Sequence, residues 1–393
     1  MNRRIAELLD RDDVRRARAW LESHDAGTLG LQEQLVAIPA PTGAEGERAA
    51  FVEDRMRAIA LADVHTDVAG NVLGRLGEGP LPGLVLCSHL DTVFPAGTPL
   101  DVTRTGARLS APGIGDNARG LAALLVLAEA IRECGVRLNG PLTFVASVGE
   151  EGEGNLRGVR HLLGDASFRP EGFVALDGPG LERVVHRGLG SRRVRVTYRG
   201  PGGHSWAAFG VPNPAHAVGL ATARIAEIPL PAEPRTTLTV ARLGGGTTIN
   251  TIPQEAWLEV DLRSEVTDAL ESARAAMTGA LREALEVSNR RRASGTAALT
   301  MDTVSLGDRP PGSTAPQHPL VRAAVAATQA LGATPKLAAG STDANVPMSL
   351  GIPAIALGAG GRGGDAHLTS EWFENVGGPE GIARVLLVVL ATG

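Results

Sequence analysis

The sequence predicts an α/β fold in which a mixed or parallel sheet is flanked by helices and a smaller second unit is inserted into the chain. The apolar runs LVLCSHLD (84–91), LTFVASV (142–148) and FVALDG (173–178) have the composition of buried parallel strands. Between the first two lies an apolar segment of helical length, GLAALLVLAEAIREC (120–134). Strand–helix–strand alternation of this kind indicates a sheet with helices on its faces.

The flanking segments extend this first unit at both ends. Residues 1–60 have apolar residues at helical spacing, interrupted by a turn at Pro39 and Pro41. Near the C-terminus, HPLVRAAVAATQALG (318–332) and IPAIALGAG (352–360) return to a helix and a buried strand, as if the first sheet resumed.

The intervening segment has its own order of elements. Strands are expected at 192–200, 236–243, 256–264 and 296–306, and helices at 212–228 and 266–287. This β-α-β-β-α-β order is the ferredoxin-like pattern. We therefore expect a main domain formed by residues 1–189 and 308–393, and an inserted domain at 190–307.

Composition narrows the class of protein. The 393 residues are 43% hydrophobic and 21% charged, which indicates a packed globular protein with room for two domains. The net charge of -5 gives no electrostatic reason to expect nucleic acid or an anionic membrane as partner. The N-terminal MNRRIAELLDRDD lacks the apolar core of a signal peptide, and the longest apolar run, 121–128, is shorter than a membrane span. Two cysteines are too few for a disulfide framework. These features predict a soluble cytoplasmic protein.

Polar residues follow the predicted strands. In open α/β sheets, ligand-binding and catalytic residues usually lie at the carboxyl ends of the strands. His89 and Asp91 are two residues apart at the end of the first strand, so they point to the same face. They could be a metal-binding imidazole with an orienting carboxylate, or a structural hydrogen-bonded pair. Asp116 lies before the apolar helix, where an acidic residue alone fits an N-cap.

The run VGEEGEG (148–154) ends the second strand with adjacent carboxylates. Gly149 and Gly152 can bend the backbone so that Glu150 and Glu151 face one pocket. Beside a divalent cation, one carboxylate can bind the metal while the other takes a proton from water. A solvated turn is the alternative for this run, and it is the role expected of Glu153.

Asp177 follows the third strand, and His367 lies after a glycine-rich loop near the C-terminus. Taken alone, the first fits a turn and the second is incidental. Together with His89, Asp116 and Glu151, they supply nitrogen and oxygen ligands for two divalent ions. Zinc is the expected metal, with cobalt or manganese as alternatives. A bridging Asp116 would complete a two-metal site for hydrolysis.

Nine short motifs then give the chain a resemblance to a known family. They are SHLDTV, GIGDNARG, GEEGEGNLRG, LDGPG, GPGGHS, INTIP, DLR, STDA and AHLTSEW, in this order over about residues 84–375. In these motifs the chain resembles the two-zinc exopeptidases and deacylases, which include peptidase T, the carboxypeptidase G type, acetylornithine deacetylase, succinyl-diaminopimelate desuccinylase and aminoacylase.

The resemblance implies a role for each residue of the site. One zinc would be held by His89 and Asp177 and the other by Glu151 and His367, with Asp116 bridging them. Glu150 would be the general base, Asp91 would orient His89, and Asp116–Asn117 would be a cis peptide bond.

The resemblance also implies roles for the insert and for substrate binding. The insert would be a lid that forms a homodimer, and His204 would stabilise the oxyanion in a neighbouring subunit's active site. Asn250 and Arg263 would hold the substrate, Arg263 through a carboxylate, for which its planar fork is suited. Ser341 and Thr342 of the STDA motif complete the implied substrate-binding set.

These expectations together predict one enzymatic reaction, with one alternative substrate class. The expected enzyme is a metallopeptidase that cleaves an amide bond in small peptides, through a hydroxide between two zinc ions with Glu150 as base. The alternative is a deacylase of N-acyl amino acids.

Two metal-free readings fit less well. A serine hydrolase could use Ser205 in Gly203–Ala207, with Asp343 and His367, but glycine and proline flank the serine where a strand and a helix are needed. A nucleotide loop after Glu151 has glycine spacing one residue too long for G-x-G-x-x-G, and its glutamates would repel phosphate.

Overall fold

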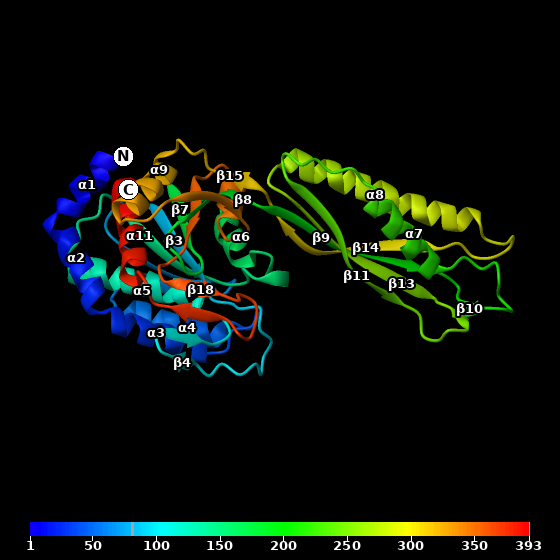
Figure 1. Cartoon of the computed structure of the whole chain (residues 1–393), viewed down its shortest axis with the longest axis horizontal. Coiled ribbons are helices and arrows are strands. Elements are labelled where there is room, and N and C mark those ends of the chain that lie inside the picture. Colours follow the sequence, from blue (N-terminus) through cyan, green and yellow to red (C-terminus); the bar gives the residue numbers. More distant parts are fainter. Residues whose placement is uncertain (80–81, 393) are drawn as a thin grey trace. The chain divides into compact units, whose positions relative to one another are not determined.

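The computed structural model describes residues 1–79 and 82–392, which form two compact units (Figure 1). The main unit comprises Met1–Gly188 and Gly312–Gly393, and the insert unit comprises Leu189–Pro311. Within the described residues, no helix combines the length and apolarity needed to cross a lipid bilayer.

A mixed sheet lies at the centre of the main unit. Within residues 1–79 and 82–392 it has nine strands in the order β1-β2-β6-β3-β7-β17-β8-β15, with β16 also paired to β8. The central strands β6, β3, β7 and β17 run parallel, and the three predicted parallel strands are β3, β6 and β7. The strands are β1 (Ala62–Thr66), β2 (Val72–Leu76), β3 (Leu84–His89), β6 (Leu142–Ser147), β7 (Gly172–Leu176), β8 (Arg183–Gly188), β15 (Gly312–Ser313), β16 (Lys336–Gly340) and β17 (Ala354–Leu357).

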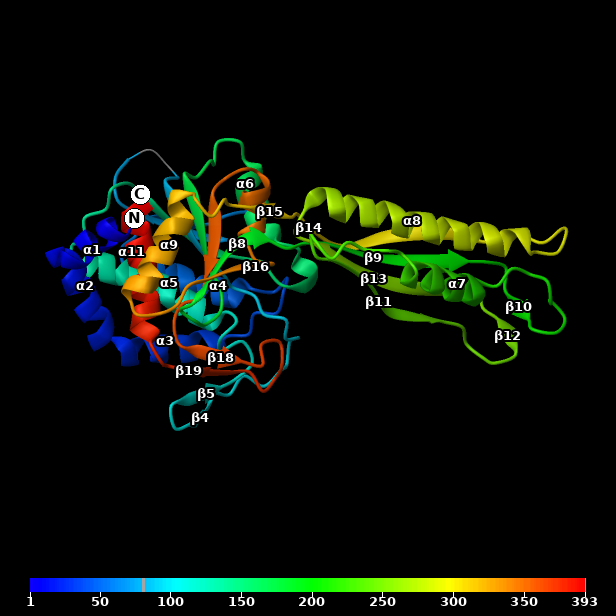
Figure 2. The ribbon, with the colours of Figure 1, turned by 45° about the horizontal axis from the view of Figure 1, so that its top comes forward.

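Helices cover both faces of this sheet, which confirms the predicted α/β class. Alternation along β3 explains the two layers, because Leu84 and Leu86 join one apolar core while Val85 and Cys87 join another. Figure 2 shows α9 and α11 on one side of the strands and α6 on the other. The helices are α1 (Asn2–Asp10), α2 (Asp12–Ser23), α3 (Asp25–Ala37), α4 (Gly46–Ala58), α5 (Ala118–Glu133), α6 (Arg157–Gly164), α9 (Pro319–Ala330), α10 (Asn345–Ser349) and α11 (Gly378–Thr392).

A small antiparallel sheet joins two distant loops of the main unit. Its strands in the described chain, in spatial order, are β18 (Arg362–Gly364), β19 (Trp372–Glu374), β5 (Arg108–Ser110) and β4 (Thr103–Thr105). Trp372 lies opposite Ser110, and the amide of Ala111 donates to the carbonyl of Glu371 at 3.1 Å. The segment after β5 therefore runs beside the segment before β19.

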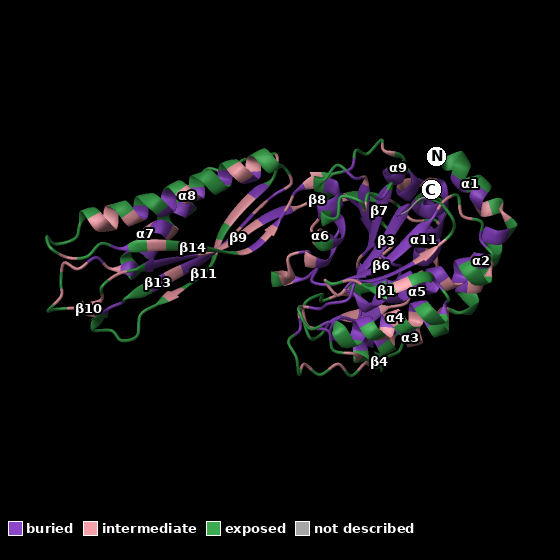
Figure 3. Ribbon diagram, turned by 180° about the vertical axis from the view of Figure 1, so that it is seen from behind, coloured by how far each residue is buried: buried purple, intermediate pink, exposed green. Residues whose placement is uncertain are grey.

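The insert unit has its own sheet and core. Its strands β9 (Gly190–Arg199), β11 (Thr236–Gly245), β13 (Glu255–Ser264) and β14 (Thr300–Arg309) pair antiparallel in the order β11-β13-β9-β14. Helices α7 (Pro214–Ala226) and α8 (Thr267–Arg290) pack on the sheet through residues such as Val196, Ala221 and Leu281. Figure 3 shows α8 with a buried stripe and an exposed one, as an amphipathic helix requires.

Candidate metal centre

The order of the central strands places the candidate residues at one edge of the main sheet. His89 ends β3, and Asp177 directly follows β7, the parallel neighbour of β3. Glu150 and Glu151 follow β6, which pairs with β3 on the other side. Because the carboxyl ends of parallel strands meet at one edge, these side chains converge there.

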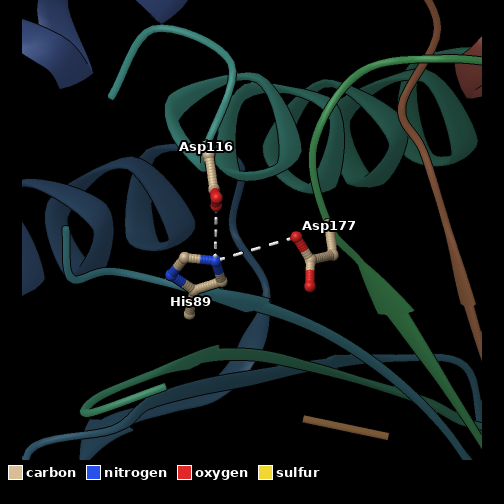
Figure 4. A group of neighbouring side chains, drawn as sticks. All are labelled: His89, Asp116 and Asp177. Carbon is tan, nitrogen blue, oxygen red and sulfur yellow. Dashed lines mark ion pairs between the residues drawn. The ribbon is translucent and has the colours of Figure 1, made fainter. Parts of the chain in front are cut away.

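The first cluster of side chains contains His89, Asp116 and Asp177 (Figure 4). The Nε2 atom of His89 lies 3.1 Å from Asp116 Oδ1 and 3.9 Å from Asp177 Oδ1. Asp116 is not the N-cap of α5, because Asn117 occupies that position. The Asp116–Asn117 peptide bond is cis, as expected.

The second cluster contains Asp116, Glu151 and His367. The Nε2 atom of His367 lies 3.0 Å from Glu151 Oε1 and 3.3 Å from Asp116 Oδ2. Asp116 thus belongs to both clusters, and each of its carboxylate oxygens faces a different imidazole.

The glycines beside the glutamate pair bend the end of β6. Gly149 and Gly152 have φ of +65° and +47°, in the left-handed region that favours glycine. Glu150 and Glu151 are both buried, and each has an oxygen within 4.8 Å of a ring nitrogen of His89. Glu153 is exposed. The solvated-turn reading therefore fits Glu153 and not the other two glutamates.

Asp91 contacts both His89 and the glutamate loop. Its backbone carbonyl lies 3.0 Å from His89 Nδ1, whereas its carboxylate Oδ1 is 3.6 Å from that nitrogen. The carboxylate instead accepts the amides of Glu150 and Glu151, each at 2.9 Å, and the hydroxyl of Thr42 at 2.8 Å. Asp91 therefore fixes the backbone of the glutamate pair, a role that spacing in the sequence did not reveal.

The close packing of these groups shifts their pKa values. Burial lowers the pKa of His89, but the carboxylates of Asp116 and Asp91 more than offset this and hold it well above its ordinary value. Asp116 and Glu151 raise the pKa of His367 to about 10. Burial and the nearby charge of Asp116 raise the pKa of Asp177 to about 7. Burial raises the pKa of Asp116, but His367 and His89 outweigh it and hold the pKa well below its usual range.

Glu371 is a buried acid that the sequence reasoning did not single out, although it lies in the AHLTSEW motif. Its carboxylate accepts the amides of Gly113, Gly115 and Asp116. Burial raises the pKa of Glu371 to about 7, although these backbone hydrogen bonds oppose the shift.

Ser341 and Thr342 lie in the main unit, in the loop between β16 and α10. The Thr342 hydroxyl accepts the amide of Ala344 at 3.2 Å. Asp343 of the same loop accepts a hydrogen bond from Ser147 at 2.5 Å, which ties the loop to the end of β6.

His204 and Asn250 lie near each other within the insert unit. His204 ends β10 (Gly203–His204), which pairs with β12 (Thr251–Ile252), and the amide of Ser205 donates to the carbonyl of Asn250 at 2.9 Å. Turns follow Ser205, and α7 begins only at Pro214, so the strand–serine–helix elbow of a serine hydrolase is not formed.

Arg263, the third candidate of the insert unit, lies on β13. It is partly exposed, and its Nε donates to Asp261 Oδ2 at 2.7 Å.

The donor set of the two clusters fits divalent metal ions. Imidazole nitrogens and carboxylate oxygens are ligands that zinc prefers. Asp116 Oδ1 is buried and accepts no well-directed hydrogen bond from the described residues, although His89 Nε2 is close. A buried acceptor without a donor, beside the carboxylates of Asp177 and Glu151, is suited to a cation.

The sequence matches peptidase family M20/M25/M40 over residues 85–391. The chain belongs to this family. It is 27% identical to succinyl-diaminopimelate desuccinylase of Corynebacterium glutamicum over 241 residues, 59% of this chain and 65% of the relative. It is 30% identical to carboxypeptidase G2 of a Pseudomonas species over 190 residues, 45% of each chain. The matches thus cover less than two thirds of these curated relatives.

Among solved structures, the aminopeptidase PepT of Bacillus cereus has the same fold as this M20 chain. The TM-score is 0.74 at 22% identity, and the superposition covers 93% of this chain and 97% of PepT.

Protons and metal ions should compete at this M20 site. Histidine must be neutral, and carboxylates ionised, to bind a metal. Because the pKa of His367 is raised to about 10 and that of Asp177 to about 7, a metal ion bound by these two side chains at neutral pH would displace protons. We expect apparent zinc affinity to rise from pH 6 to pH 8, about tenfold per pH unit for each proton displaced. Calorimetric titrations in buffers of different ionisation enthalpy measure the protons released, and an affinity independent of pH would contradict the expectation.

Proposed function

We propose that this M20 protein is a metal-dependent hydrolase that cleaves an amide bond in small peptides. The observation that carries the proposal is the position of Asp116, whose two carboxylate oxygens face the imidazoles of two separate clusters. One cluster would hold a first divalent ion through His89 and Asp177, and the other a second ion through Glu151 and His367. Zinc is the proposed metal, because both clusters combine imidazole with carboxylate.

The roles of the protein groups follow from their positions. Two bound divalent ions would polarise the scissile carbonyl and lower the pKa of water. Glu150 is buried beside Glu151 and would act as general base, taking a proton from water and delivering it to the leaving nitrogen. Asp91 would keep both glutamates oriented through their backbone amides.

We propose that the insert unit is a ferredoxin-like lid through which two copies form a homodimer. Its β-α-β-β-α-β order and antiparallel sheet support the ferredoxin-like description. His204, which is exposed, would reach the partner's active site and stabilise the oxyanion. Asn250 lies beside it and would contact the substrate. Arg263 would bind a substrate carboxylate, exchanging its partly exposed pairing with Asp261 for the substrate.

Two substrate classes fit the metal site, and they differ in the group on the acyl side of the bond. Peptides are proposed because the HLDTV and STDA motifs and the glycine-rich approach to His367 resemble the peptidase T side of the family. The desuccinylase name of the Corynebacterium relative favours the second candidate, N-acyl amino acids. Ser341 and Thr342 are proposed substrate contacts in either case.

Replacing the proposed base should separate catalysis from metal binding. In the Glu150→Gln variant we expect both metal ions to remain and kcat to fall by about 10²–10⁴-fold, because no other group would accept the water proton. Glu153→Gln is the matched control, since this exposed glutamate lies in the same loop. Metal content and steady-state turnover of the zinc-loaded proteins decide the outcome. Near-wild-type turnover in Glu150→Gln would remove Glu150 from this role.

A substrate panel tests the proposed specificity. The zinc-loaded enzyme should hydrolyse dipeptides or tripeptides with higher kcat/KM than N-acetyl or N-succinyl amino acids. Removing the metal with a chelator should abolish turnover, zinc should restore it, and serine-directed reagents should have no effect. Preference for N-acyl substrates would establish the deacylase candidate instead, and turnover that survives metal removal would contradict both.

Mixing two inactive variants tests whether His204 acts across a dimer. His204→Asn alone should lose about 10²–10³-fold in kcat, the usual cost of one oxyanion donor. If protomers exchange after His204→Asn is mixed with Glu150→Gln, heterodimers contain one site with both groups intact. Random exchange should then restore about a quarter of wild-type activity. No recovery, under conditions in which protomer exchange is verified by a size tag, would contradict action between subunits.

A further inference from the structure

Asp116 needs a fixed backbone if one carboxylate is to serve both clusters. It lies at the end of the loop APGIGD (111–116), which is rich in glycine and has no regular secondary structure. Gly113 has φ of +78°, so the loop uses a conformation that other residues rarely adopt. A loop of this composition needs outside contacts to hold one geometry.

The contacts come from Glu371, which lies 255 residues further along the chain. Its Oε1 accepts the amides of Gly115 at 2.9 Å and Asp116 at 2.8 Å, and its Oε2 accepts the amide of Gly113 at 2.8 Å. The side chain is buried, and hydrogen bonds from amides to a carboxylate are stronger than those between neutral groups. One carboxylate therefore binds three amides of the Asp116 loop.

The small sheet explains how Glu371 reaches this loop. β19 begins directly after Glu371 and pairs with β5, which ends directly before Ala111. The backbone bond from the Ala111 amide to the Glu371 carbonyl continues the pairing by one residue. His367 lies four residues before Glu371, in the same segment, so the segment that supplies His367 also anchors the loop that supplies Asp116.

The loop that contains Gly115 packs closely against the Glu371 carboxylate. A Cβ atom on Gly115 would lie 3.0 Å from Glu371 Oε1 and 3.4 Å from Pro179. A side chain at 115 would therefore press against this carboxylate. A substitution at 115 would therefore disturb the hydrogen bond between the residue 115 amide and Glu371 by changing the loop, whereas a substitution at 371 would change the carboxylate.

We propose that Glu371 is a positioning residue of the metal centre, which fixes the backbone of Asp116 so that both oxygens of its carboxylate face their separate metal sites. Glu371 belongs to none of the potential metal-binding groups among the described residues, and its oxygens accept three amides. The inference rests on the proposed two-metal site and adds to it a residue that controls how well the bridge is formed.

The test is zinc binding by the full-length protein, measured by competition with a chromophoric chelator. The Glu371→Gln variant keeps one oxygen but places an NH₂ group against an N–H donor. We expect it to bind at least one of the two zinc ions about 10–100-fold more weakly than wild type, as for other residues that orient metal ligands. Glu371→Leu removes every acceptor and should lose more affinity than Glu371→Gln. Glu374→Gln on the same strand β19 is the matched control and should bind zinc like wild type.

Kinetics then distinguish positioning from general stabilisation. With zinc added to saturation, folded Glu371→Gln should show reduced kcat with KM changed less than about twofold, because the bridge and not substrate binding is altered. A purely structural role would leave kcat of the refilled protein unchanged. Gly115→Ala provides a second variant with a smaller expected loss of zinc affinity, and it decides the matter if Glu371→Gln does not fold.

Wild-type zinc affinity in Glu371→Gln would overturn the inference, as would wild-type affinity in Gly115→Ala where the first variant is unfolded. An unchanged kcat after zinc saturation would overturn it too. These outcomes are distinct from failure of the proposed function. If wild type binds two zinc ions but hydrolyses none of the panel substrates, the affinity comparison still tests Glu371.

Discussion

Repulsion between crowded carboxylates is the constraint on which this site depends. Asp116, Glu151 and Asp177 gather within a few ångströms of His89 and His367, at the edge where the parallel strands of the main sheet end. Burial and the charge of Asp116 together raise the pKa of Asp177, and the neighbouring carboxylates raise the pKa values of both histidines. Such a cluster is stable only where positive charge or hydrogen-bond donors offset the repulsion.

Backbone amides also bind acids that lie next to this cluster. Asp91 accepts the amides of Glu150 and Glu151, and Glu371 accepts the amide of Asp116 with two others. Glu45 has the same function one residue earlier in the glutamate loop, where it accepts the amide of Gly149 at 3.0 Å. The loop of Asp116 and the loop of the glutamate pair are therefore each held by buried acids that lie outside the two clusters.

The sequence predicted the parts of the site that follow from local pattern. Buried strands were recognisable as apolar runs, and His89 and Asp177 were found because they end two of them. Asp91 was noticed as a neighbour of His89, but its bonds to the glutamate amides depend on how β3 and β6 pair. Glu371 was not singled out because three-residue strands such as β5 and β19 show no periodicity, and its contacts span more than 250 residues. Contacts of that range are set by tertiary pairing, which spacing in the sequence does not encode.

The hydrogen bonds suggest a physical rule for separating ligands from supports among buried acids. The oxygens of Asp91 and Glu371 accept backbone amides, and removing either carboxylate would leave buried N–H groups unpaired at a cost of about 1–3 kcal/mol each. Asp116 is the reverse case, because its buried Oδ1 accepts no well-directed hydrogen bond among the described residues. A cation satisfies that oxygen without unpairing any other group. The same comparison supports the proposal that Asp116 binds the metals while Glu371 binds the backbone, although the two residues are in direct contact.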